Sequence, residues 1–206
     1  MLVILGWGLS TDDPYAVVST VLDLHPTTAV ATSRPQVGVL IEAAPALVPR
    51  VAANMSRLHS RASFALPEDA PEATVTDIRL AGGDPIPLLN SGALIGWLKT
   101  RGELKRSAQT LGLTGPLLYA VPNHAFTLGQ YALAKTAGAS PVSGAFDYTP
   151  GEDSELLRAG QIVEINLTSG SHVARVLDSL STQLQRRGLR AVSISDLMRA
   201  DGAHNG

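Results

Sequence analysis

The sequence alternates short apolar runs with longer amphipathic segments, and this alternation limits the folds that are open to the chain. A short apolar run bounded by turn residues is typical of a strand that is buried on both faces of a parallel sheet. Amphipathic segments between such runs are typical of helices that cover the sheet. The predicted strands are residues 2–5, 27–32, 37–41, 62–66, 117–121, 142–146, 162–167 and 191–194. We therefore expect an α/β fold with mostly parallel strands.

Apolar residues at helical spacing predict the segments that pack on this sheet. The clearest such segment begins at Ser171 and ends at Gly188, with one apolar face along its length. Other helices are predicted over residues 46–58, 91–111 and 127–136, and Ser195 is predicted to cap a short terminal helix. Residues 67–87 contain four prolines and the pair Gly82-Gly83. This composition predicts a loop that includes one strand at residues 74–80.

Length and composition exclude several classes of protein. The chain has 206 residues, which suits a single domain over residues 1–206. Its content of 45% hydrophobic and 17% charged residues excludes wholesale disorder. A net charge of −2 gives no general attraction to nucleic acid, and the absence of cysteine excludes disulfides and thiolate metal sites. No apolar run approaches the roughly 18 residues of a membrane-spanning helix.

Four stretches of the C-terminal half resemble a known family. They are Gly102-Glu-Leu-Lys-Arg-Ser-Ala-Gln, Leu117-Leu-Tyr-Ala-Val-Pro-Asn123, Gly160-Gln-Ile-Val-Glu-Ile-Asn-Leu and Arg187-Gly-Leu-Arg-Ala-Val-Ser-Ile-Ser-Asp-Leu197. Over about residues 100 to 198 the chain is similar to the polysaccharide deacetylase (NodB-homology) family. The resemblance implies a distorted (β/α)7 barrel of the polysaccharide deacetylase type. In such a barrel the site lies at the carboxyl ends of the strands.

The resemblance also implies a chemistry, namely the metal-assisted deacetylation of N-acetyl sugars. In that family one Asp and two His hold a divalent metal, usually zinc, while a second Asp acts as base and a late His as acid. The family motif T-F-D-D-G ends the first strand, and the simplest placement on Leu5-Gly6-Trp7-Gly8 leaves both aspartates missing. A slipped placement uses Asp12 and Asp13 instead, although these residues also suit the cap of the following helix.

The family's paired metal histidines have no counterpart. They come from the motif H-[ST]-x-x-x-H, and no two histidines of this chain are separated by three or four residues. The five histidines are at positions 25, 59, 124, 172 and 204. In the family's R-P-P-Y motif, Ala120 replaces the arginine, and Asn123 and His124 follow at the end of the strand. His124 is a candidate for sugar contact or acid catalysis, the alternative being a histidine in a surface loop.

Further positions of the family pattern carry polar residues. Asp147 matches the Asp that tunes the catalytic His, and Asn166 takes the place of that His in Ile165-Asn166. An asparagine can hydrogen-bond a sugar hydroxyl but cannot relay a proton near neutral pH. His172 follows at the start of the next helix, where it either turns toward the site or stays in solvent. Trp7 ends the first predicted strand and is a candidate platform for sugar stacking.

The predicted function is therefore that of a non-catalytic domain of the polysaccharide deacetylase type. The predicted ligand-binding residues are Trp7, Asn123, His124, Asp147 and Asn166, with no metal ligand and no cofactor. The expected partner is a glycan or a cell-envelope protein, and neither nucleic acid nor a membrane span is expected. The bias of 13 Arg to 3 Lys is typical of a GC-rich bacterial genome. We expect an extracytoplasmic location, and the sequence leaves the cytoplasm open.

Two alternatives remain open at this point. One is an active metal-dependent carbohydrate N- or O-deacetylase with a rearranged zinc site, built from Asp12, Asp13, His59 and His124. The other is a helper domain that associates tightly with a glycosyltransferase or a membrane protein. Bound zinc and acetate release distinguish the first from a binding module, and tight association without catalysis distinguishes the second.

Overall fold

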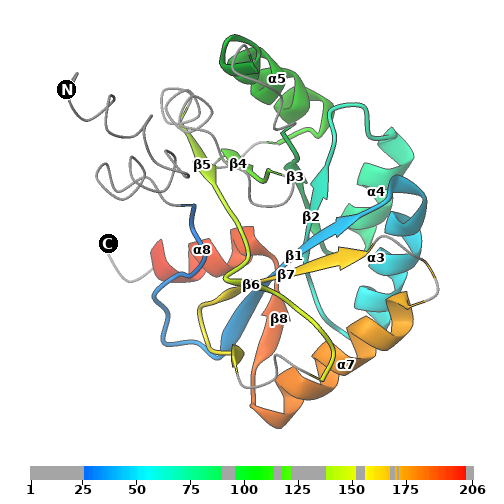
Figure 1. The fold of residues 1–206 in the computed structure, drawn as a ribbon, viewed down its shortest axis with the longest axis vertical. Coiled ribbons are helices and arrows are strands. Elements are labelled where there is room, and N and C mark those ends of the chain that lie inside the picture. The colour runs from blue at the N-terminus through cyan, green and yellow to red at the C-terminus, as the bar shows by residue number, and fades with distance from the viewer. Residues whose placement is uncertain are drawn as a thin grey trace, which may run out of the picture.

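A parallel sheet forms the centre of the molecule (Figure 1). The computed structural model describes residues 26–89, 96–113, 117–121, 138–151, 156–167, 170 and 172–202. Its main sheet has the order β3-β2-β1-β7-β6, and β8 also pairs with β1. These strands are β1 (Gln36–Ala43), β2 (Ser63–Leu66), β3 (Asp84–Pro87), β6 (Phe146–Asp147), β7 (Ile162–Leu167) and β8 (Arg190–Val192). All pairings within this sheet are parallel, as the alternating sequence pattern predicts.

Backbone hydrogen bonds continue from β3 around to β7. The strands β4 (Leu117–Tyr119) and β5 (Ala139–Pro141) pair in parallel, and an isolated bridge joins Leu88 after β3 to Ala120 after β4. On the other side, the backbone N–H of Ala145 donates to the carbonyl of Ile162 at 2.7 Å. The strands therefore follow one another around a distorted barrel.

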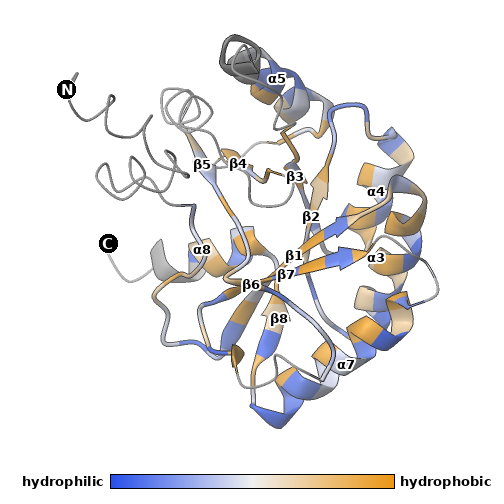
Figure 2. Cartoon of the chain, viewed as in Figure 1, coloured by the Kyte–Doolittle hydropathy of each residue, from blue (hydrophilic) through white to orange (hydrophobic). Residues whose placement is uncertain are grey.

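Helices cover the outside of this barrel. They are α3 (Val48–Arg57), α4 (Glu72–Leu80), α5 (Gly96–Thr110) and α7 (Val173–Arg186), with a 3-10 turn at Pro45–Leu47. A further helix, α8 (Ile194–Gly202), lies at one end of the barrel. In Figure 1, α3, α4 and α7 lie along one outer face of the sheet. The buried positions of α3 recur at helical spacing, at Val48, Val51, Ala52 and Met55. Apolar colouring accordingly concentrates on the strands and on the sides of these helices that meet them (Figure 2).

The strands have two apolar faces because alternate side chains point to opposite sides. In β1, Val39 and Ile41 belong to the core shared with the helices, whereas Leu40 belongs to a second cluster inside the barrel. This inner cluster takes Ala65, Ile86, Leu118, Val142 and Ile162 from other strands or strand ends, and Ile194 and Leu197 from α8. A layer of apolar side chains therefore fills the barrel, and α8 closes its amino-terminal end.

Several predicted elements are confirmed. Residues 162–167 form β7 with the predicted bounds, and the predicted strands at 37–41 and 62–66 lie in β1 and β2. The helices predicted over 46–58 and 171–187 are present as α3 and α7. The strand predicted at 2–5 and the helix predicted at 127–136 lie outside the described residues.

The strand predicted at residues 74–80 is wrong, because this segment is helix α4. Its β-branched residues favour a strand by propensity, yet Thr74, Val75 and Ile78 are buried at helical spacing against the sheet. Pro71 precedes the helix, and Glu72 places a negative charge in its first turn, where the helix dipole favours it.

Three other predictions need correction. The strand predicted at 142–146 is replaced by β5 and β6 on either side of Gly144. Residues 27–32 contain isolated bridges at Thr27 and Ala29 in place of a strand. The last helix begins at Ile194, and its cap is Ser193 instead of Ser195, since Ser193 Oγ accepts a hydrogen bond from the backbone N–H of Asp196 at 3.2 Å.

Candidate functional site

A pocket of about 540 Å³ opens at the carboxyl end of β7. Its wall is formed by Tyr148, Thr149 and Pro150, by Ile165 to Leu167, and by His172, Arg175 and Val176. Barrels of parallel strands carry their binding residues at this end, because the loops that follow the strands converge there. The pocket is therefore the first candidate for a functional site.

Two predicted site residues meet beside this pocket. Asn166 Nδ2 donates a hydrogen bond to Asp147 Oδ1 at 3.2 Å, and both side chains are exposed. The pair forms because Asp147 lies in β6, which runs parallel to β7. With its amide nitrogen directed to Asp147, Asn166 keeps its amide oxygen as an acceptor for an incoming hydroxyl.

His172 is the residue that precedes α7, and it also lines the pocket. Its Nδ1 lies 3.2 Å from Arg175 Nη2, and Arg175 also lines the pocket. A guanidinium only donates, so Nδ1 must accept and the neutral ring carries its proton on Nε2. His172 is exposed and also contributes to the pocket wall, so both positions considered for it stay open.

A buried acid, Glu164, lies two residues before Asn166 and was not singled out from the sequence. It is 3% exposed, and its Oε2 accepts a hydrogen bond from the backbone N–H of Gly144 at 3.0 Å. It shares the inner face of β7 with Ile162 and Asn166. A charged residue inside the apolar run Ile162–Leu167 was the available signal, but its partner at Gly144 is visible only in three dimensions.

The ends of β1 and β3 face the same end of the barrel. β1 ends with Glu42 and Ala43, and Glu42 stands in register with Asn166 of β7. After β3 comes Leu88, which packs against the inner apolar cluster. Within the part of the chain that the structure describes, no three His, Asp or Glu side chains gather as a group able to hold a metal ion.

His59 lies at the opposite end of the barrel. It precedes β2, has a φ of 50°, and lines a different pocket together with Gln36 and Arg190 at the amino ends of β1 and β8. The structure thus separates His59 from the pocket at Asn166. Trp7, Asp12, Asp13, Asn123 and His124 lie outside the described residues, so their roles stay predictions.

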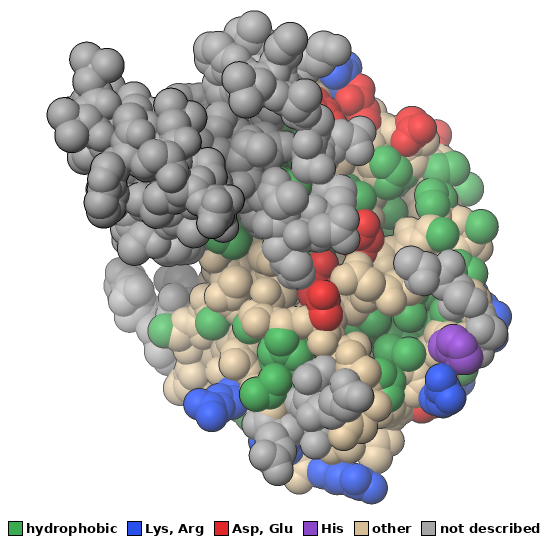
Figure 3. All heavy atoms as spheres, in the orientation of Figure 1, with side chains coloured by type: hydrophobic (Ala, Val, Ile, Leu, Met, Phe, Trp, Pro, Cys, Tyr) green, Lys and Arg blue, Asp and Glu red, His purple; other side chains and the backbone are tan. Residues whose placement is uncertain are grey.

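Acidic side chains are visible near the middle of the face in Figure 3, and basic ones lie toward its lower rim. The lining of the carboxyl-end pocket combines one cation, Arg175, with a neutral amide, a histidine and apolar wall residues. Ligand pockets commonly have this composition, with a few polar groups placed on an apolar wall. None of the described helices is both long and apolar enough to cross a membrane.

Comparison with solved structures identifies the fold. A carbohydrate esterase family 4 (CE4) pseudoenzyme from Bacillus anthracis, BA3943, matches with a TM-score of 0.68 and 17% identity, over 87% of this chain and 71% of that one. The Bc1960 peptidoglycan N-acetylglucosamine deacetylase matches with a TM-score of 0.72 and 14% identity, over 88% and 96% of the two chains. A family 4 carbohydrate esterase from Bacillus anthracis matches with a TM-score of 0.72 and 13% identity, over 90% and 92%.

No protein-family model and no curated protein matches the sequence. The structural matches nevertheless establish that the chain has the fold of the CE4 polysaccharide deacetylases. The barrel expected from the resemblance is thereby confirmed. The structures that share it include both deacetylases and a pseudoenzyme, so the fold by itself is compatible with either role.

Proposed function

We propose that the chain is a non-catalytic domain of the polysaccharide deacetylase type that binds a glycan in the pocket beside Asn166. The observation that carries this proposal is the sequence at the end of β1. β1 is followed by α3 and then β2, as expected for the first strand of the barrel. We therefore align the T-F-D-D-G motif with Leu40-Ile41-Glu42-Ala43-Ala44, in place of the expected position at residues 5–8. One acid is then retained as Glu42, and the other is replaced by Ala43.

The end of β3 supports the same conclusion. The metal histidines of the family belong to a motif that would follow this strand, where this chain has Leu88. Residues 60–123 contain no histidine at all. A zinc site needs about three protein ligands, each an imidazole, carboxylate or thiolate. The residues at the ends of β1 and β3 do not fit zinc, so we propose no metal and derive no step that uses one.

The polar groups of the pocket suit a sugar. The amide of Asn166 and the Nε2–H of His172 supply an acceptor and a donor, and Asp147 holds the amide in place. Tyr148 also lines the pocket, and its hydroxyl is hydrogen bonded to Ser179 Oγ at 2.9 Å. Sugars are bound by such planar hydrogen-bonding groups next to apolar surface. One similar structure is a peptidoglycan N-acetylglucosamine deacetylase, and we therefore propose an N-acetylated glycan of the bacterial cell envelope as ligand.

Calorimetric titration with oligomers of N-acetylglucosamine tests the proposal. We expect measurable binding to the purified chain, at least fivefold weaker binding for Asn166→Ala, and no acetate release. His59→Ala is the matched control, because this histidine lies at the other end of the barrel. Absence of binding at millimolar glycan, or equal binding by Asn166→Ala, would contradict the glycan site.

An active metal-dependent deacetylase is the second candidate. It is favoured by the acid retained at Glu42 and by the exposed Asp147 at the same end of the barrel. This candidate requires stoichiometric zinc in protein purified without chelator and acetate release that depends on it. Either finding on the unaltered chain decides against the non-catalytic proposal and leaves the fold assignment untouched.

A further inference from the structure

We infer that a second pocket, at the amino-terminal end of the barrel, binds a multiply charged phosphate, such as a pyrophosphate group. This pocket has a volume of about 420 Å³. Four arginines line it, at positions 34, 61, 190 and 199, and Asp196 is its single acid. With His59 neutral, the lining carries three formal positive charges in a chain whose net charge is −2. The pocket thus concentrates a charge opposite to that of the whole chain.

Four separate parts of the fold supply these arginines. Arg34 precedes β1, Arg61 precedes β2, Arg190 begins β8 and Arg199 lies in α8. They meet because the first residues of β1 pair with β8, from Gln36 opposite Arg190 to Gly38 opposite Val192. The parallel strands bring their amino ends to the same edge, and α8 follows directly from β8. The cluster is therefore built by the barrel itself and not by one flexible loop.

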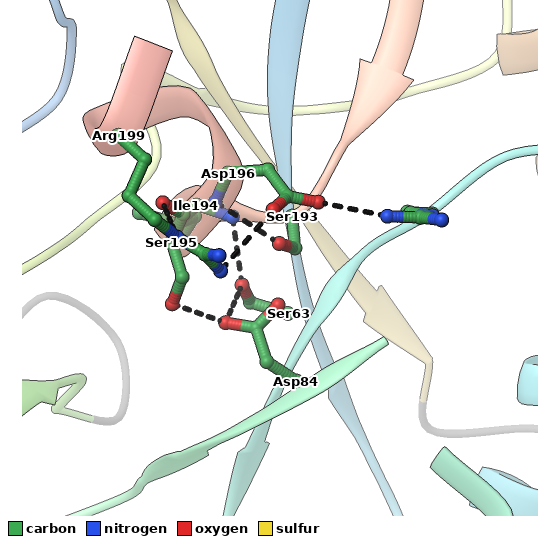
Figure 4. Close-up of polar contacts among 8 residues, drawn as sticks. Ser63, Asp84, Ser193, Ile194, Ser195, Asp196 and Arg199 are labelled. Atoms are coloured by element: carbon green, nitrogen blue, oxygen red, sulfur yellow. Dashed lines mark hydrogen bonds and ion pairs between the residues drawn. The ribbon is translucent and has the colours of Figure 1, made fainter. Parts of the chain in front are cut away.

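Two of the arginines are already held in position. Asp196 Oδ2 lies 3.3 Å from Arg61 Nη1, and Asp196 Oδ1 lies 3.2 Å from Arg199 Nη2. Arg199 Nε also donates to the backbone carbonyl of Ser195 at 3.2 Å. Figure 4 shows the ion pairs of the Asp196 carboxylate with Arg199 and with a second guanidinium group. It also shows the hydrogen bond from the Asp196 backbone N–H to Ser193 Oγ. One acid thus orients two cations without neutralising the pocket.

The other two arginines have no side-chain partner among the described residues. Arg34 and Arg190 are exposed at the pocket, and neither takes part in an ion pair there. The lining therefore offers two free guanidinium forks.

Phosphate chemistry fits this arrangement better than a simple carboxylate. A guanidinium binds two oxygens at once, and each phosphate presents three acceptor oxygens and more than one negative charge. Arginines that approach from different elements can share the oxygens of one tetrahedral group, whereas a carboxylate offers only two oxygens in a plane. The volume also exceeds what one small anion needs, which favours a diphosphate or a phosphate carried on a larger molecule.

Titration with pyrophosphate in a phosphate-free buffer of low ionic strength tests the inference. We expect saturable binding that weakens with added salt, and at least tenfold weaker binding for the double variant Arg34→Ala with Arg190→Ala. Both side chains are exposed, so these changes leave the fold intact. The matched control is Arg186→Ala, an exposed arginine at the end of α7, which should change affinity by less than twofold.

The variant Asp196→Asn should bind pyrophosphate more tightly, whereas the arginine variants should bind it more weakly. Removal of the single acid should strengthen pyrophosphate binding several-fold, which a purely structural role for Asp196 does not predict. Citrate, an anion of similar charge but with carboxylate groups only, should bind at least tenfold more weakly. The inference is overturned if pyrophosphate fails to bind at millimolar concentration, if the double variant binds normally, or if citrate binds equally well.

Discussion

Ser195 Oγ donates a hydrogen bond to Asp84 Oδ2 at 2.6 Å, although 111 residues separate the two in sequence. The same carboxylate oxygen accepts a bond from Ser63 Oγ at 3.0 Å, and Ser63 Oγ in turn accepts the backbone N–H of Ile194 at 2.8 Å. Figure 4 shows the four residues as one connected group. This network joins the amino ends of β2 and β3 to the first turn of α8.

Asp84→Ala should therefore destabilise the fold. Loss of the carboxylate leaves two hydroxyl groups without their acceptor in a partly buried place, which costs about 1 to 3 kcal/mol. Denaturant unfolding followed by circular dichroism measures the change. Asp69→Ala, at an exposed carboxylate with no partner among the described residues, is the control and should change the unfolding free energy by less than about 0.5 kcal/mol. Equal stability of both variants would contradict the role of the network.

Gly144→Ala should also destabilise, for reasons of space. A Cβ on Gly144 would lie 2.5 Å from Glu164 Cβ and 2.9 Å from the Glu164 backbone nitrogen, so the strand or the loop must shift. Overpacking of this kind costs about 1 to 3 kcal/mol. The control is Gly102→Ala within α5, where the nearest atom is the far end of the long, exposed Arg106 side chain and alanine should stabilise the helix by about 0.5 to 1 kcal/mol. Opposite shifts in melting temperature are expected, and shifts of the same sign would refute the prediction.

His172→Ala should weaken glycan binding at least threefold, because it removes the Nε2–H donor at the pocket. His172→Gln should recover part of the affinity, since its amide can again donate a hydrogen bond. Calorimetric titration of the three proteins should therefore give the highest glycan affinity for the wild type, an intermediate one for His172→Gln and the lowest for His172→Ala. If Gln and Ala bind alike and as well as the wild type, His172 has no part in recognition.

Asn166→His should produce no deacetylase. The substitution restores an imidazole at the family's acid position, but Ala43 and Leu88 still stand at the ends of β1 and β3. We expect no acetate release from N-acetylglucosamine oligomers, with or without added zinc. Acetate release by this variant would mean that a metal is held by residues other than those considered.

Zinc and chelator should leave the melting temperature unchanged. A ligand that binds only the folded state raises its stability with the logarithm of the ligand concentration relative to the dissociation constant, so a tight structural or catalytic zinc site would be evident in a thermal scan. The measurement is a melting curve in excess chelator and in equimolar zinc. A rise of several degrees with zinc that chelator reverses would count against the metal-free proposal.

Strands with one continuous pattern were predictable from the sequence. β7 was predicted with its observed bounds, since apolar residues stand at positions 162, 163, 165 and 167. α4 was not, because Thr74, Val75 and Ile78 are β-branched and favour strands by propensity, while contact with the sheet decides for a helix. Local sequence patterns therefore identified the elements whose intrinsic propensity agrees with their packing in the fold. They failed at α4, where packing against the sheet overrides the strand propensity.

The site was predictable only in part. Asp147 and Asn166 were named through the family resemblance, and the structure brings them together. The role of Glu164 could not be predicted, because its hydrogen bond from the Gly144 backbone N–H forms only once β6 pairs with β7. The arginine pocket could not be predicted, because its members lie far apart in sequence and meet through the pairing of β1 with β8. Patterns within one segment contain no information about such long-range neighbours.

Gly38 pairs with Ile162 on one edge of β1 and with Val192 on the other, and a Cβ there would lie 3.0 Å from Leu197 Cδ2. Residues 190–202 therefore close the amino-terminal end of the barrel. Without β8, the first residues of β1 would expose an unpaired edge next to apolar side chains. A polar substitution at Leu197 should accordingly promote aggregation of partly folded molecules as well as lower the stability of the folded protein.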